Sequence, residues 1–173
     1  MQPTASTLTQ ETSAQKTDFR AGKYLTFLIG KEEYGVGVLK VREIMGVQEV
    51  TAVPQTPAWM KGVINLRGKI IPVVDLRLKF GLETIGYTER TCIIVVQVAS
   101  AGATLPMGIV VDEVSEVLTM SAGDIEDTPD FGSCVATDYI LGMAKIKGKV
   151  KILLDIDQVL TTQEIHGLTA TLQ

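Results

Sequence analysis

The sequence predicts an all-β protein, mainly strands with a few short helices, built from two similar small β-barrels. Two observations lead to this fold class. Short β-rich runs alternate with glycine-containing turns along most of the chain. One hairpin is evident at residues 62–74, and a second copy of it follows later in the chain. Because half of this chain would bury too little surface to be stable alone, we expect the two barrels to share a hydrophobic core.

The clearest hairpin covers residues 62–74, where two apolar runs flank the turn Arg67-Gly68. Gly68 supplies the positive φ that such a tight turn needs. Arg67 stands at the tip, where a charged side chain stays in water. Asp75 then caps a short helix at 76–80. The sequence therefore predicts an exposed arginine on a rigid hairpin.

The remaining elements follow from the same signals. In chain order we expect strands at 24–29 and 34–39, a helical turn or bent strand at 40–45, and a short strand at 51–53. A polar loop at 83–89 precedes strands at 91–98, 105–111 and 114–120, a long surface loop at 121–134, a hairpin of 139–146 and 150–154, and a helix at 156–160 capped by Asp155. The run 91–98 is nearly all apolar and β-branched, which predicts a strand buried on both faces.

The chain contains an internal repeat. A shift of 80 positions places Gly62 on Gly142, Arg67 on Lys147 and Asp75 on Asp155. A weaker match at a shift of 73 places residues 35–44 on residues 108–117. Two repeats of short strands predict two related barrels, and the sequence leaves open whether terminal strands are exchanged between them.

The domain organisation follows from these patterns. Residues 1–20 lack hydrophobic periodicity and are expected to form a disordered leader. One domain is expected at 21–162, with subdomains at roughly 21–82 and 90–162 and a flexible tail at 163–173.

Composition excludes several classes of function. Of 173 residues, 46% are hydrophobic, which is enough for a substantial core. The net charge of −4 and the 5% aromatic content argue against nucleic acid or an anionic membrane as a partner. No apolar run is long enough to span a membrane, and the leader lacks a signal-peptide core. Cys92 and Cys134 are expected to be free thiols in a reducing cytoplasm.

The sequence offers no cluster that resembles an active site. His166 is the only histidine and lies in the tail, which disfavours a metal site or a Ser-His-Asp triad. The acidic segment 124–130 lacks the spacing of a calcium loop. We therefore predict no enzyme, no cofactor and no metal.

Binding surfaces are the better candidates for function. They are the Arg67 tip, the segment 41–44, and its repeat mate 114–117, because in each of them apolar residues adjoin charges. Within 40–45, Val41, Ile44 and Met45 are the apolar residues, and the three charged residues are expected to face water. For Val41 and Val114 the alternative is plain core packing.

Four runs of the chain resemble the CheW family, the coupling proteins of bacterial chemotaxis. They are YLTFLIGKEEYGVGVLKVREI at 24–44, TPAWMKGVINLRGKIIPVVDLRLKF at 56–80, GIVVDEVSEVL at 108–118 and DYILGMAKI at 138–146. The resemblance covers about residues 23–160, and the NLRG block at 65–68 is its most specific part.

The resemblance implies two SH3-like five-stranded β-barrels packed on a shared hydrophobic core. It implies a cytoplasmic, non-enzymatic adaptor that joins the tip of chemoreceptors to the regulatory domain of the CheA kinase and is recruited to membrane-associated arrays. It also allows weak self-association. The resemblance and the candidate surfaces together give these partner-binding residues: Val41, Glu43, Ile44, Gly62, Asn65, Arg67, Gly68, Gly108, Val114 and Val117.

Two alternatives stay open at this point. One is a coupler of a related pathway with another output, such as pili or development. The other is a small-molecule-binding barrel that uses the cleft between the halves. Glu113 departs from the family pattern, in which many relatives have glycine before the valine, and the departure concerns the second-barrel surface.

Overall fold

The computed structural model of the protein describes residues 19–83, 85–100, 102–130, 137–160 and 164. Most of the predicted leader and tail, with Cys134 and His166, lies outside these residues. The strands are β1 (Gly22–Ile29), β2 (Glu32–Gly37), β3 (Val41–Gly46), β4 (Met60–Leu66), β5 (Lys69–Asp75), β6 (Cys92–Ser100), β7 (Ala103–Val111), β8 (Glu113–Met120), β9 (Ile125–Glu126), β10 (Ile140–Ile146) and β11 (Lys149–Leu154). The helical turns are η1 (Val38–Lys40), α2 (Leu76–Lys79) and η2 (Ala122–Asp124).

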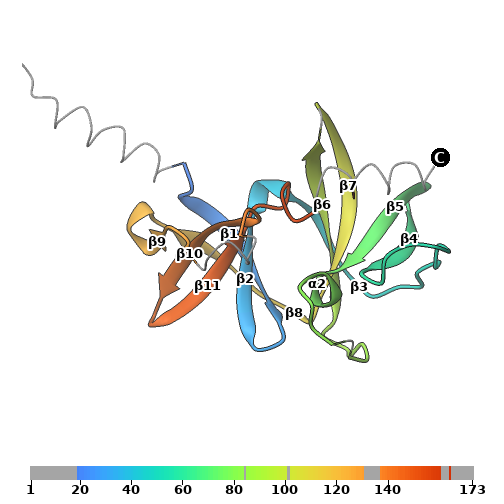
Figure 1. The fold of residues 1–173 in the computed structure, drawn as a ribbon, viewed down its shortest axis with the longest axis horizontal. Coiled ribbons are helices and arrows are strands. Elements are labelled where there is room, and N and C mark those ends of the chain that lie inside the picture. The colour runs from blue at the N-terminus through green and yellow to red at the C-terminus, as the bar shows by residue number, and fades with distance from the viewer. Residues whose placement is uncertain (1–18, 84, 101, 131–136, 161–163, 165–173) are drawn as a thin grey trace, which may run out of the picture.

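The strands form two sheets that lie side by side (Figure 1). A five-stranded sheet has the order β3-β6-β7-β5-β4, and a six-stranded sheet has the order β8-β1-β2-β11-β10-β9. The N-terminal hairpin, blue in Figure 1, therefore pairs with the orange C-terminal strands through the parallel pair β2–β11. The six-stranded sheet draws strands from both ends of the chain, and the five-stranded sheet consists of β3 to β7 from its middle, so the two halves of the chain are interleaved.

Each sheet closes on itself, because the chain that leaves one edge strand pairs with the strand at the opposite edge. In the five-stranded sheet, the chain leaving edge strand β3 reaches Thr51, which pairs with Val63 on the opposite edge strand β4. In the six-stranded sheet, the chain leaving β8 passes through η2 to β9, which pairs with β10. A sheet whose edges meet in this way is a barrel. The predicted mainly β fold with two small β units is confirmed.

The two repeated hairpins are confirmed, and their turns are alike. Arg67 and Gly68 have φ values of 51° and 83°, and Lys147 and Gly148 have 53° and 79°. Two successive positive φ values define the type I′ turn, whose twist matches that of the flanking strands. Gly68 was expected to have a positive φ, and in both turns the residue before the glycine has a positive φ as well.

Three apolar clusters form the core, and the largest is shared by both sheets. It joins Phe27 and Val36 of the six-stranded sheet to Ile94 and Ile109 of the five-stranded sheet. A second cluster, with Ile93 and others, lies within the five-stranded sheet alone, and a third lies within the six-stranded sheet. Strand β6 contributes alternate residues to the first two clusters, so its burial on both faces is confirmed.

An aromatic stack reinforces the shared core between the sheets. Phe27, Tyr34, Phe80 and Tyr139 stack in that order, with centroid separations of 6.1, 5.4 and 5.4 Å. They come from β1, β2, the end of α2 and the residue before β10. Such stacked pairs add to the burial energy of their rings. Burial raises the pKa of the Tyr34 hydroxyl, and Tyr139 and Glu32 raise it further.

Several predicted elements need correction. Residues 40–45, predicted as a helical turn or bent strand, are the end of a 3₁₀ turn followed by the irregular strand β3, so this prediction holds, with Ile44 exposed. Residues 51–53 form only the Thr51 bridge. The loop 121–134 contains η2 and β9, although 131–136 lie outside the described residues. We call the five-stranded sheet the first barrel and the six-stranded sheet the second barrel. The second barrel has six strands rather than five because the two-residue β9 completes it.

The predicted helix at 156–160 is wrong, whereas its counterpart after Asp75 is correct. Asp75 accepts hydrogen bonds from the N–H groups of Arg77 and Leu78 and caps α2. Asp155 accepts one side-chain hydrogen bond, from the N–H of Asp157, and a turn follows. Asp157 is held by other residues through its carboxylate, and its neighbours Ile156 and Val159 are buried in the shared core. These tertiary contacts override the local helix signal.

Asp155 is expected to give the stability of the protein a distinct pH dependence. Burial raises the pKa of its carboxyl, so the folded protein binds this proton more tightly than the unfolded chain does. Its contribution to the free energy of unfolding is therefore greatest below the unfolded pKa and is lost as the pH rises through the folded pKa. Asp155→Asn, which keeps an acceptor for the Asp157 N–H, should flatten this part of the curve in urea titrations between about pH 3 and pH 7. Identical slopes for the variant and the native protein would contradict this assignment.

Candidate functional site: partner-binding surfaces

The predicted residues around Arg67 come together in the structure. Arg67 Nη2 donates to Glu43 Oε1 at 2.7 Å, across the gap between the β4–β5 turn and β3. Asn65 Oδ1 accepts the N–H of Gly68 at 2.8 Å and rigidifies the turn. The Arg67 side chain is 74% exposed, whereas that of Glu43 is 27% exposed. The geometry fixes one side of the guanidinium and leaves the rest of it in water.

Exposed apolar side chains accompany this ion pair. Ile44, next to Glu43, is 44% exposed, and Ile70, two residues after the Arg67-Gly68 turn, is 60% exposed. Ile70 was not among the predicted residues. The repeat could have revealed it, because a shift of 80 places Ile70 on Val150, which is also exposed. We call Glu43, Ile44, Arg67 and Ile70 the first surface.

The second barrel carries a related surface. Val117 on β8 is 54% exposed and Val150 on β11 is 49% exposed, and they match Ile44 and Ile70 in the repeat. Lys147 occupies the turn position of Arg67. We call Val117, Lys147 and Val150 the second surface. The pairing of the two surfaces follows the internal repeat.

Two predicted glycines occupy positions that the fold itself requires. Gly62 has φ 142°, and a Cβ there would overlap the carbonyl oxygen of Thr51. A Cβ at Gly108 would lie 2.9 Å from Cγ2 of Ile93. Contacts this close leave no room for a side chain, so these residues allow close approach of neighbouring strands. The structure places neither glycine with the Arg67 group.

Val41 and Val114 occupy equivalent inner positions. Both are partly buried and pack against the shared core. This is the arrangement that the core-packing alternative expects. Their neighbours Ile44 and Val117 point outward instead.

Comparison with known proteins places these features in a family. A family model for the CheW-like domain matches residues 23–164. The chain belongs to the CheW-like domain family. Similar relatives include chemotaxis protein CheW of Klebsiella aerogenes, 40% identical over 162 residues that cover 94% of this chain and 91% of the relative. CheW of Rhizobium meliloti is 38% identical over 88% of this chain and 97% of its own.

A solved structure and a further relative extend this comparison. The structure of the scaffolding protein TtCheW from Thermoanaerobacter tengcongensis matches with a TM-score of 0.74 and 32% identity, covering 83% of this chain and 97% of that one. Protein FrzA of Myxococcus xanthus is 30% identical over 81% of this chain and 86% of its own. As a member of this family, the chain is a chemotaxis coupling adaptor and a scaffold.

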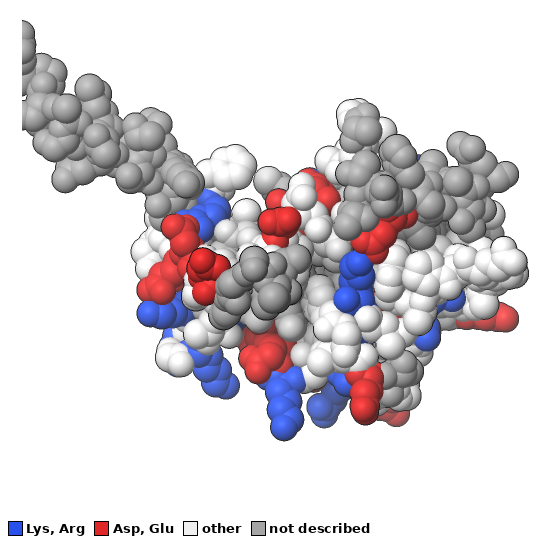
Figure 2. Space-filling model, viewed as in Figure 1, with Lys and Arg blue, Asp and Glu red and all other residues white. Residues whose placement is uncertain are grey.

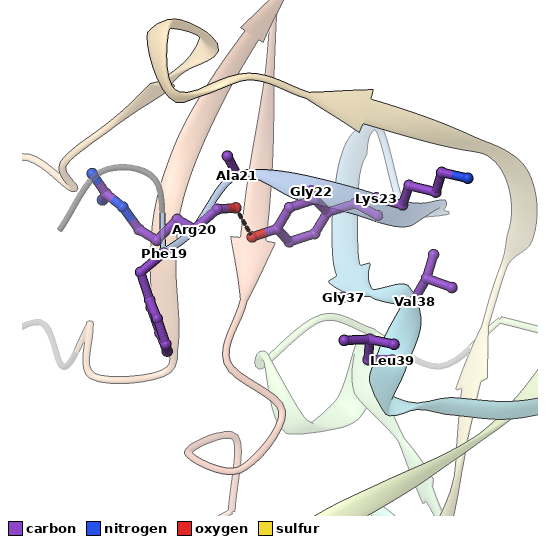
Figure 3. Close-up of a pocket in the computed structure, with 9 residues that line it drawn as sticks. Phe19, Arg20, Ala21, Gly22, Lys23, Gly37, Val38 and Leu39 are labelled. Carbon is purple, nitrogen blue, oxygen red and sulfur yellow. Dashed lines mark hydrogen bonds between the residues drawn. The ribbon is translucent and has the colours of Figure 1, made fainter. Parts of the chain in front are cut away.

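The chain around the start of β1 and η1 lines an open pocket of about 340 Å³ (Figure 3). Phe19, Val38 and Leu39 supply apolar side chains to its wall. Some of its polar groups have protein partners, since the Tyr24 hydroxyl donates to the Arg20 carbonyl and Arg20 Nη1 pairs with Asp127, while the buried Arg20 Nε has no hydrogen-bond partner among the described residues. One buried N–H offers less than the several convergent polar groups that orient a small ligand.

Neither charged residues nor possible metal ligands mark a further site in the described part of the chain. On the face shown in Figure 2, positive and negative side chains are interspersed along the lower rim. Among the described residues, no group of three or more His, Cys, Asp or Glu side chains is placed to hold a metal ion. None of the described helices is long and apolar enough to cross a membrane.

Proposed function

We propose that the protein is a non-catalytic bridge between the cytoplasmic tip of a chemoreceptor and the regulatory domain of a CheA-type histidine kinase. The observation that carries this proposal is the pair of repeat-related surfaces, one on each barrel. Apolar side chains ringed by charges are typical of protein interfaces, and arginine is frequent among the residues that dominate their energy. Receptor binding would then recruit the protein from the cytoplasm to membrane-associated arrays.

The two surfaces suit different partners. The first surface carries an ion pair, so we assign it to the receptor, with the guanidinium of Arg67 donating charge-assisted hydrogen bonds. The second surface carries the exposed apolar side chains Val117 and Val150, and we assign it to an apolar contact with the kinase regulatory domain. The same kind of contact between copies of the chain would give weak self-association.

A binding experiment with matched variants tests this assignment. Ile70→Asp and Val150→Asp change equivalent positions of the two barrels. Each places a charge where an apolar contact is proposed, which should weaken the affected partner by about tenfold or more. The expected result in pull-downs is that Ile70→Asp loses the receptor-tip fragment and keeps the kinase domain, while Val150→Asp does the reverse. If the native protein binds neither partner, the proposed function is wrong.

The pathway that the protein serves is a separate question. Because the chain is similar to FrzA of Myxococcus xanthus, a second candidate function is a coupler of a related pathway whose output is not swimming, such as pili or development. Expression in a swimming bacterium that lacks its own coupler tests this. Restored chemotactic spreading would favour the swimming pathway, and binding to the cognate kinase without restored spreading would favour the second output.

A further inference from the structure

The chain passes between the two barrels twice, through very short segments. Between β2 and β3 the crossing is η1 (Val38–Lys40), and between β7 and β8 it is the single residue Asp112. All the other described strands follow one another within one sheet. The relative orientation of the barrels therefore depends on two crossings and on the shared core.

An ion pair holds each crossing in place. At the second crossing, Arg77 Nη1 of α2 donates to Asp112 Oδ2 at 2.7 Å, and the same oxygen accepts the N–H of Gly30 at 2.7 Å. At the first crossing, Lys40 Nζ donates to Asp157 Oδ2 at 2.8 Å, and Asp157 Oδ1 accepts the N–H of Ala99 at 2.8 Å. At both crossings, one carboxylate pairs with a cationic side chain and accepts a hydrogen bond from a backbone N–H.

These groups join the two barrels. Arg77 follows the β4–β5 hairpin of the five-stranded sheet, and Gly30 lies in the β1–β2 turn of the six-stranded sheet. Asp157 follows the last hairpin of the six-stranded sheet, and Ala99 lies on β6 of the five-stranded sheet. Each carboxylate thus connects elements that no strand pairing connects.

The internal repeat relates the places of the two ion pairs only in part. A shift of 80 places the cation Arg77 on the carboxylate Asp157, whereas a shift of 73 places Lys40 on Glu113, the residue after Asp112. The two ion pairs thus lie at corresponding crossings of the chain and share one directly matched position.

Burial distinguishes these pairs from two exposed ion pairs, Lys145–Glu126 and Arg90–Glu113, although not from Lys151–Glu33 within the six-stranded sheet, whose side chains are 8% and 26% exposed. The Arg77 and Asp112 side chains are 15% and 22% exposed, and those of Lys40 and Asp157 are 39% and 23% exposed. The Lys145–Glu126 pair is 63% and 59% exposed, and Arg90–Glu113 is 76% and 39% exposed with 3.8 Å between its charged atoms. Exposed pairs contribute little, whereas partly buried charge-assisted bonds are stronger and directional.

We infer that Arg77–Asp112 and Lys40–Asp157, here called the crossover ion pairs, fix the orientation of one barrel relative to the other. This inference rests on the proposed function in one respect: the orientation set by these positioning residues determines how strongly receptor binding changes kinase activity. Binding of a ligand at one site of a protein can change the activity at a second site only if both sites respond to the same structural change. The crossings are the segments about which such a change would occur.

The test uses paired variants with the same change in charge. Asp112→Asn with Asp157→Asn removes both crossover ion pairs and keeps an acceptor for each backbone N–H. Glu113→Gln with Glu126→Gln removes the same charge from the exposed pairs and is the control. Spin labels at Gln48 and Thr119, one exposed position on each barrel, report the distance between barrels in a background with Cys92→Ser and Cys134→Ser.

The expected result is a broadened distance distribution in the crossover variant and an unchanged one in the control. Binding of the isolated kinase regulatory domain should persist, while receptor-dependent kinase activation should fall by about fivefold or more. An unchanged distance distribution overturns the inference, and so does full activation despite a broadened one. If the double variant does not fold, the single variants Asp112→Asn and Asp157→Asn are measured in the same way. If the native protein fails to bind the kinase, the proposed function fails, and the distance measurement still decides the role of the crossover ion pairs.

Discussion

Gly62→Ala should destabilise the protein by about 3 kcal/mol or more, because the new methyl group meets backbone rather than a movable side chain. A Cβ at this position would overlap the Thr51 carbonyl oxygen, and the φ of 142° is one that side chains rarely adopt. Thr51 and Val63 exchange two hydrogen bonds of 2.9 Å here, and this pairing joins the edges of the five-stranded sheet. The substitution should therefore break the Thr51–Val63 pairing that joins the two edges of the first barrel.

Gly46→Ala is the matched control for this prediction. Gly46 also lies in a strand of the five-stranded sheet, and a Cβ there would meet nothing within 4 Å. Its effect should stay within about 0.5 kcal/mol. Urea unfolding followed through the single tryptophan, Trp59, measures both variants. If Gly62→Ala lowers the free energy of unfolding by less than about 1 kcal/mol, the backbone around Thr51 can move to make room for the methyl group, and the prediction is wrong.

Gly62 illustrates how a position can matter for binding without touching a partner. The resemblance to the CheW family places it among the partner-binding residues, yet its environment is backbone on the inner side of β4. We expect binding and stability to fall together in Gly62→Ala. Arg67 differs in this respect, because its exposed side chain can be changed without disturbing the core.

Local signals predicted the hairpins correctly because tight turns are encoded by the residues that form them. Gly68 and Gly148 mark two such turns, and the apolar runs beside them become β4, β5, β10 and β11. The repeat then predicted two barrels on one core. These features depend on short-range geometry and on burial, both of which leave patterns in a sequence.

Features that depend on contacts between distant segments were not predictable in the same way. The parallel pairing of β2 with β11 joins residues more than a hundred positions apart, and the sequence left this exchange open. The helix predicted after Asp155 does not form, because Lys40 and Ala99, both distant in sequence, bind the Asp157 carboxylate. The exposure of Ile70 depends on which face of β5 the barrel turns outward. Tertiary contacts decide each of these outcomes.

Arg67→Glu should weaken receptor binding by about 2 kcal/mol or more, which is roughly 30-fold in affinity. The substitution removes a proposed donor to the receptor and places a second carboxylate beside Glu43, whose Oε1 now accepts from Arg67 at 2.7 Å. Lys147→Glu is the control, because Lys147 has the same turn position and a φ of 53° against 51° for Arg67. The control should retain receptor binding, and thermal melting should show both variants folded.

The double variant Arg67→Glu with Glu43→Arg separates two ways in which Arg67 could act. The exchange restores an ion pair across the same gap between the β4–β5 turn and β3, with its polarity reversed. If Arg67 only braces the first surface, the double variant should recover the affinity lost by Arg67→Glu. If Arg67 donates directly to the receptor, a carboxylate at this position cannot replace it, and binding should stay lost. We expect the second outcome, because the guanidinium is 74% exposed and its one ion pair leaves further N–H groups facing water. Native affinity in the double variant would contradict a direct contact, and native affinity in Arg67→Glu alone would contradict any role for this residue in receptor binding.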